Sequence, residues 1–341
     1  MSEMIVTSLV GSYPQPEWLI DREALRRRLP PRVRVRELWR VDSAWLRDAQ
    51  DDAVILAIRD QERAGLDVIT DGEMRRESYS NQFANALDGL DLDHPGTIVS
   101  RAGTPARVPR VTGPIVRRRP VHVADVEFLR ANTDRTVKVT VPGPFTMSQQ
   151  AQNDFYAHDE ELAFAYADAV REEIDDLFAA GADIVQLDEP WLEARPEPAR
   201  RFGLETLQRA LAGARGTTAV HICFGYPAFV PDHPPAYTYL AELAGCPADQ
   251  ISIETAQSGV ELSVLTELGD KTIILGVVAL DTAEAETPAT VADRLRRALP
   301  YRAPGKLVAA PDCGMKYLPR DAAFAKLQAM VAGARAASAG A

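Results

Sequence analysis

Residues 160–190 read EELAFAYADAVREEIDDLFAAGADIVQLDEP and contain the unit that decides the fold. Apolar residues recur at helical spacing over residues 160–180, and Gly181 then interrupts the pattern. The short apolar run 184–187 follows, and it ends in the polar group Asp188-Glu189-Pro190. A continuous apolar run is typical of a strand buried on both faces of a parallel sheet, so this stretch predicts a helix followed by such a strand.

The same kind of apolar run occurs eight times along the chain, with helical patterns or polar breaks between the runs. The runs are residues 8–10, 68–70, 137–141, 184–187, 219–222, 251–253, 273–278 and 307–310. Eight strands joined by helices predict an α/β protein, a single closed (β/α)8 barrel of the TIM type spanning residues 1–341. Strand counting alone also permits a doubly wound open sheet.

Two regions depart from this repeat. Residues 14–50 are rich in arginine and proline, and we expect them to form an N-terminal helical extension that covers the barrel. Residues 76–136 carry prolines between short β-like runs and form an insertion after the second strand. Because the insertion is longer than a plain connection needs, it predicts a lid or a hairpin that faces the substrate.

The composition argues against several classes of protein. The chain has 341 residues and a net charge of −11, and it has no basic stripe of the kind that binds phosphates, so no nucleic-acid partner is expected. No run of about eighteen apolar residues and no signal-peptide pattern is found, which predicts a cytoplasmic protein without a membrane contact. The three cysteines, Cys223, Cys246 and Cys313, are expected to be free thiols or metal ligands rather than a disulfide framework.

Reactive side chains close several of the predicted strands, at the end of a β/α barrel where function resides. His221 and Cys223 are two residues apart on one strand, so both side chains point the same way and can clamp a metal. Cys313 and Glu254 close other strands and would complete a tetrahedral site. This mixed donor set favours zinc over magnesium or calcium. The alternative is a core histidine beside a buried cysteine, and the further candidate ligands argue against it.

Seven short stretches, in order and over essentially the whole chain, resemble the carboxyl-terminal catalytic barrel of cobalamin-independent methionine synthase. They are VGSYPQ (10–15), DGE (71–73), GPFT (143–146), QLDEP (186–190), HIC (221–223), IET (253–255) and PDCG (311–314). The resemblance implies that zinc is bound by His221, Cys223, Glu254 and Cys313, and that homocysteine is held by Gly11, Ser12, Glu73 and Asp188. The histidine that the family uses near strand seven falls at Asp281, the candidate catalytic residue here.

The chemistry of such a site agrees with this implied function, methyl transfer to the thiol of homocysteine. A free thiol with a pKa of about 8.5 is mostly protonated at neutral pH, whereas a zinc-bound thiol is deprotonated. Glu254 would be the labile ligand that yields to the substrate sulfur. Glu73 and Asp188 would bind the substrate ammonium group, and backbone N–H groups near Gly11 would bind its carboxylate.

The methyl donor is left open by the sequence. The full-length synthase of the family has a second, N-terminal barrel, which we do not expect here, and its folate-stacking tryptophan falls near Gln150. We therefore expect poor use of polyglutamylated methyltetrahydrofolate. A more activated methyl group, as on a corrinoid or a sulfonium, would need less help and could be bound under the insertion or delivered by a partner protein.

Three other functions remain as alternatives. The first is zinc-dependent alkylation of another thiol, for example of coenzyme M by an epoxide. The second is a uroporphyrinogen decarboxylase-like reaction, which needs no zinc. The third is a non-enzymatic zinc protein, and the displaceable carboxylate argues against it because structural zinc sites are closed by thiolates and imidazoles.

Overall fold

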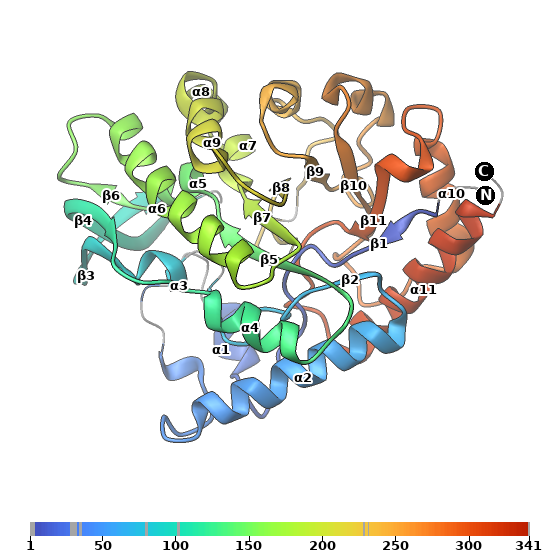
Figure 1. Cartoon of the computed structure of the whole chain (residues 1–341), viewed down its shortest axis with the longest axis horizontal. Coiled ribbons are helices and arrows are strands. Elements are labelled where there is room, and N and C mark those ends of the chain that lie inside the picture. The colour runs from blue at the N-terminus through green and yellow to red at the C-terminus, as the bar shows by residue number, and fades with distance from the viewer. Residues whose placement is uncertain are drawn as a thin grey trace.

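The computed structural model describes residues 4–27, 33, 36–78, 81–100, 103–227, 229–230 and 232–339. Its main sheet has eight strands in the order β1-β11-β10-β9-β8-β7-β5-β2, and every neighbouring pair is parallel (Figure 1). A parallel bridge between Ser8 and Val68 joins the first strand to the last, so the sheet closes into a barrel. The predicted (β/α)8 barrel is confirmed, and the open sheet is excluded. The strands are β1 Val6–Thr7, β2 Val68–Ile69, β5 Thr136–Pro142, β7 Ile184–Asp188, β8 Thr217–Ile222, β9 Gln250–Ile253, β10 Thr272–Val278 and β11 Leu307–Pro311.

The inside of the barrel changes from apolar to polar along the strands. One apolar cluster, separate from the large core, contains residues of most strands: Val10, Val68, Ile184, Ala219, Ile274, Val308 and Ala310. On β7, Gln186 and Asp188 follow Ile184 at two-residue intervals and therefore lie on the same face of the strand. On β8, His221 follows Ala219 in the same way. The polar residues thus gather at the carboxyl ends of the strands, where barrel enzymes place their sites.

Helices surround the barrel on the outside (Figure 1). Along α6 the buried residues Leu162, Tyr166, Val170, Ile174 and Leu177 recur every three or four positions and form the stripe that packs on the sheet. No helix in the described part of the chain is long and apolar enough to cross a membrane. The α-helices are α1 Arg22–Arg27, α2 Leu46–Ala64, α3 Asn81–Ala84, α4 Val123–Ala131, α5 Pro144–Gln149, α6 Asp159–Ala179, α7 Pro190–Ala194, α8 Pro196–Pro198, α9 Leu204–Leu211, α10 Pro288–Ala298 and α11 Arg320–Ser338. Shorter elements are η1 Arg36–Leu38, η2 Ala199–Gly203, η3 Leu240–Gly245, η4 Leu262–Leu268 and η5 Pro304–Lys306.

The predicted N-terminal extension contains α1 and η1, which pack on each other through Ile20, Leu25 and Leu38. Part of the predicted extension, residues 28–32 and 34–35, lies outside the described residues. Arg22 and Arg26 donate hydrogen bonds to backbone carbonyls of the loop that leads from β11 to α11, so α1 is tied to the barrel there. The end of the 14–50 region is the first turn of α2, a regular barrel helix.

The insertion after β2 contains a long antiparallel hairpin, β3 Leu87–Val99 and β4 Pro105–Arg117. The short strand β6 Gln152–Asn153 adds to β4 and completes a second, three-stranded sheet beside the barrel (Figure 1). Arg195, after α7, donates a 2.9 Å hydrogen bond to the carbonyl oxygen of Val99 and ties the hairpin to the barrel mouth. The later part of the predicted insertion is α4, the regular helix that precedes β5.

Candidate active site and metal centre

A cavity with about 800 Å³ of free space, partly open to solvent, lies at the carboxyl ends of the strands. Most of the residues singled out in the sequence line it: Gly11, Ser12, Glu73, Asp188, His221, Cys223 and Cys313. Ser100, at the end of the hairpin strand β3, and the aromatic residues Trp191, Tyr226 and Phe229 line it as well. Glu254 and Asp281 are not among its lining residues.

Three buried side chains form a group that can hold a metal ion. The ligand atoms of His221, Cys223 and Cys313 all lie within 4.8 Å of one another. The two sulfur atoms are 3.7 Å apart. Two thiolates bound at about 2.3 Å to one tetrahedral zinc would be about 3.8 Å apart, so the observed separation fits a shared zinc ion. A histidine with two cysteines also leaves one position open, as catalytic zinc sites require.

The orientation of His221 is set by the neighbouring strand. Its Nδ1 atom forms a 2.8 Å hydrogen bond with the hydroxyl of Ser252, the residue beside it in the β8–β9 register. Its Nε2 atom is buried and has no hydrogen-bond partner among the described residues. When Nδ1 donates its proton to the serine, the lone pair of Nε2 is left for a metal. Ser252 is a site residue that the sequence did not reveal.

The two sulfur ligands are thiols in the metal-free protein. None of the three cysteines, all within the described residues, forms a disulfide. The contact with Cys223, together with burial, raises the pKa of the Cys313 thiol well above its ordinary value. Metal binding at this pair must therefore release protons, as is general for thiolate sites.

Glu254 is not part of this close group of ligand atoms, and both of its carboxylate oxygens have other partners in this structure. One carboxylate oxygen accepts a 3.0 Å hydrogen bond from the backbone N–H of Phe224, and the other lies 2.6 Å from Nδ1 of His233. The His233 side chain is almost fully buried and also contacts the amide of Gln257 at 2.8 Å. His233 lies outside the predicted strand ends and has no visible metal partner in the sequence, so sequence reasoning gives it no role.

Glu73 and Asp188 bring two carboxylates to the same cavity wall. Glu73 has a φ of 56° and is the only described non-glycine residue with a positive φ, a strained conformation of the kind found at functional sites. Its Oε1 atom accepts a 3.2 Å hydrogen bond from the Thr140 hydroxyl, and its buried Oε2 atom has no partner among the described residues. Burial raises the pKa of Asp188 to about 6, although the charge of His221 acts in the opposite direction.

The segment of Gly11 and Ser12 contacts Glu73 on one side and the loop after Cys313 on the other. A Cβ atom at Gly11 would lie 2.8 Å from Oε1 of Glu73, so only glycine fits without moving that carboxylate. The carbonyl oxygen of Ser12 accepts a 2.9 Å hydrogen bond from the N–H of Met315, just after Cys313. The predicted substrate-binding segment is therefore tied to the loop that carries a metal ligand.

Asp281 is exposed in the loop after β10, and the structure does not bring it to the cavity. Gln150, the position expected to lie near the donor, lines the cavity together with Trp191, whereas the aromatic residue Phe145 is fully buried and packs on Phe202. Trp191, on α7 after β7, is almost fully buried, and the guanidinium of Arg195 lies 5.3 Å from its ring centroid.

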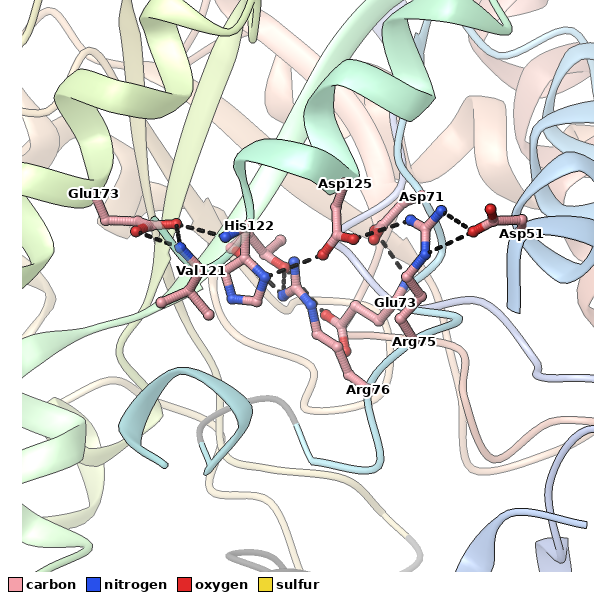
Figure 2. A network of polar contacts seen from close by, with 10 residues as sticks. Asp51, Asp71, Glu73, Arg75, Arg76, Val121, His122, Asp125 and Glu173 are labelled. Atoms are coloured by element: carbon pink, nitrogen blue, oxygen red, sulfur yellow. Dashed lines mark hydrogen bonds and ion pairs between the residues drawn. The ribbon is translucent and has the colours of Figure 1, made fainter. Parts of the chain in front are cut away.

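A buried polar network supports the segment of Glu73 from behind (Figure 2). Arg75 donates to Asp51 at 2.6 Å and to Asp125 at 3.0 Å, and Asp125 contacts the ring of His122 at 3.2 Å. The next residue, Arg76, is fully buried beside Glu73 (Figure 2). The network holds the strained turn after β2 in place.

Comparison with known proteins places this arrangement in a family. Residues 4–336 match the family described as the catalytic domain of cobalamin-independent synthase. The chain belongs to this family. The methionine synthase of Saccharolobus solfataricus is 34% identical over 97% of this chain and 94% of its own length. The methionine synthase of Sulfurisphaera tokodaii is 32% identical over 97% and 92%.

Solved structures of the cobalamin-independent methionine synthase family share the fold. A B12-independent methionine synthase from Shewanella sp. W3-18-1, in complex with selenomethionine, superposes with a TM-score of 0.87, is 33% identical and matches over 97% of both chains. A putative vitamin-B12 independent methionine synthase from Listeria monocytogenes, 21% identical with a TM-score of 0.72 over 98% of both chains, shows the same fold.

Proposed function

We propose that this protein is a zinc-dependent methyltransferase that methylates the thiol of homocysteine to form methionine, acting as a single catalytic domain in the cytoplasm. The observation that carries the proposal is the group of His221, Cys223 and Cys313, whose sulfur atoms are 3.7 Å apart and open onto the cavity that Glu73 and Asp188 also line. The methionine synthase relatives, one with bound selenomethionine, support the choice of substrate.

In this proposal His221, Cys223 and Cys313 hold zinc, and Glu254 is the fourth, displaceable ligand. Bound zinc keeps a coordinated substrate thiol in its thiolate form at neutral pH. The remaining work falls to the chain itself. His233 and the Phe224 N–H hold Glu254 when it is not a ligand, as they do in this structure.

The cavity is suited to the two ends of an amino acid. Glu73 and Asp188 provide negative charge for the ammonium group, and the free Oε2 atom of Glu73 is an acceptor ready for it. Gly11 and Ser12 line the same cavity, and their backbone N–H groups would bind the carboxylate. Asp281 is left out of the proposed machinery because its side chain is exposed outside the cavity.

For the donor we propose an activated methyl group, on a corrinoid or a sulfonium, either bound in the cavity against Trp191 or brought by a partner protein. Coenzyme M is a poorer acceptor for this site, because its sulfonate would face the two carboxylates of Glu73 and Asp188. A decarboxylase would give no reason for a buried histidine beside two cysteines.

The test is metal analysis of Cys223→Ser and Cys313→Ser, with Cys246→Ser as the matched control. Cys246 is equally buried but lies outside the cavity. We expect one zinc per chain in the wild type and the control and strongly reduced zinc in the two site variants, together with loss of methionine formation. Undiminished zinc in both site variants would disprove the metal site. Mass spectrometry of products from homocysteine with methylcobalamin, a methylsulfonium or methyltetrahydrofolate identifies the donor.

A further inference from the structure

Behind each of the two cavity carboxylates lies a buried basic side chain, and one neutral side chain connects the carboxylate to it by hydrogen bonds. We call each such chain of three side chains a relay. We infer that Lys138 and Arg76 are positioning residues that act through Gln186 and Thr140 to aim Asp188 and Glu73 at the amino group of the thiol substrate. This inference rests on the proposed function and explains how the same site selects thiols that carry an ammonium group.

The first relay starts at Lys138, which is fully buried on β5. Its Nζ atom donates to the carbonyl oxygen of Leu9 and, at 2.9 Å, to Oε1 of Gln186. Because Nζ donates here and an ionised carboxylate can only accept, the amide oxygen of Gln186 faces Lys138 and the amide nitrogen faces Asp188. That nitrogen donates a 2.8 Å hydrogen bond to Oδ1 of Asp188. Lys138 therefore fixes the orientation of the amide, and the amide fixes the carboxylate.

The second relay starts at Arg76, which donates to the carbonyl oxygen of Thr140 at 2.9 Å and to its hydroxyl oxygen at 3.0 Å. Because the hydroxyl accepts from the guanidinium, its proton is free to point at Oε1 of Glu73, 3.2 Å away. Burial acts to lower the pKa of Arg76, but the nearby charges of Asp71 and Glu73 raise it overall. Arg76 thus stays charged beside Glu73, with the hydroxyl between them.

The two relays come from alternate positions of two neighbouring strands. Lys138 and Thr140 share one face of β5, and Gln186 and Asp188 share one face of β7, which pairs directly with β5. Strands hold these side chains more firmly than loops would. The carboxylates at the cavity wall are therefore oriented by the barrel itself.

The neutral side chain in the middle of each relay leaves the carboxylate able to bind the substrate. A direct ion pair with lysine or arginine would engage the carboxylate and leave less of its charge for a ligand. Through a hydroxyl or an amide, only one oxygen of each carboxylate is held, and the second stays available, as the buried Oε2 atom of Glu73 shows. Arg76 also balances charge inside the barrel, where uncompensated carboxylates would be costly. Burial lowers the pKa of Lys138 to about 7, although the charge of Asp188 acts in the opposite direction, so Lys138 serves chiefly as the hydrogen-bond donor to Gln186.

The experiment compares two thiols that differ only in the amino group: homocysteine and its desamino analogue γ-mercaptobutyrate. Binding of each to the zinc-loaded protein is measured by calorimetry in the wild type, Lys138→Met and Thr140→Val. Val139→Thr is the matched control. It exchanges the same two residue types in the opposite direction, and Val139 lies on the outer face of the same strand. Zinc content and steady-state methylation are measured alongside.

We expect Lys138→Met and Thr140→Val to weaken homocysteine binding by about tenfold, the effect of losing one hydrogen bond to a charged group. Binding of γ-mercaptobutyrate, zinc content and the control should change little, and KM for homocysteine should rise more than kcat falls. Thr140→Val changes no charge, so it tests the inference even if Lys138→Met does not fold.

Equal losses for both thiols, or unchanged homocysteine binding in Thr140→Val, would overturn the inference while leaving the proposed function intact. Absence of homocysteine binding by the zinc-loaded wild type would overturn both. The two failures are therefore distinguishable from the wild-type measurement alone.

Discussion

Replacing Ser252 with alanine tests the metal centre without touching a ligand. The Ser252 hydroxyl is the 2.8 Å partner of Nδ1 of His221, and both side chains are almost fully buried. A buried donor left without an acceptor costs about 1–3 kcal/mol, and about 1.4 kcal/mol corresponds to a tenfold change in affinity. The cost applies to the tautomer that carries its proton on Nδ1 and presents the lone pair of Nε2 to the metal. We therefore predict that Ser252→Ala binds zinc about 10- to 100-fold more weakly, the usual effect of removing the hydrogen-bond partner of a metal-binding histidine.

The assay is competition for zinc with a chromophoric chelator, followed at equilibrium. The matched control is Ser338→Ala, another buried serine whose hydroxyl is hydrogen-bonded, at the end of α11 and outside the cavity lining. It should keep wild-type zinc affinity even if it loses stability. A folded Ser252→Ala protein with unchanged zinc affinity would refute this account of His221.

Two further predictions concern the substrate wall and the network behind it. Gly11→Ala places a Cβ atom 2.8 Å from Oε1 of Glu73, so it should raise KM for homocysteine several-fold with zinc content unchanged; an unaltered KM in steady-state assays would contradict the role of this close approach. Burial acts to raise the pKa of Asp125, but the hydrogen bond from His122 and the charge of Arg76 hold it below its ordinary value. The stability that the ionised Asp125 contributes is therefore present above pH about 4 and lost as the pH falls further. In urea unfolding, the loss in free energy of unfolding caused by Asp125→Asn should become smaller below that pH. A loss that does not change with pH would argue against this role of Asp125.

The strands of the barrel were predictable because each one is buried on both faces and therefore reads as an apolar run. Seven of the eight runs overlap strands, and the helix expected over residues 160–180 is α6 Asp159–Ala179. The first strand shows the limit, since residues 8–10 were expected and β1 is Val6–Thr7, with only the single bridge of Ser8 beyond it. After β1 the chain turns toward the cavity, so the hydrogen-bonded pairing of the strand ends before the apolar residues 8–10 do.

Site residues at strand ends were predictable for the same reason, because parallel strands deliver their carboxyl ends to one place. The relays were not predictable. In the run 137–141 the pattern Val-Lys-Val-Thr-Val gives two faces, and the sequence alone does not say which surroundings Lys138 meets. In the structure the valines pack against the helices, and Lys138 is inside the barrel. The direction of Glu254 was equally hidden, because its partner His233 comes from a loop without a repeating pattern.

The spacing of the two sulfur ligands depends on a contact across the barrel wall. Cys223 follows β8 and Cys313 follows β11, so β9 and β10 lie between them in the sheet. Asp312 spans this gap, because its buried carboxylate accepts hydrogen bonds from three consecutive N–H groups after β9, at residues 255–257, with lengths of 2.8–3.0 Å. It can do so only because the intervening strand carries Gly276, where any Cβ atom would overlap Oδ1 of Asp312. A side chain at this position would push Asp312 away and move the adjacent Cys313. The separation of the two sulfur atoms therefore depends on Gly276 and Asp312, neither of which is among the proposed ligands.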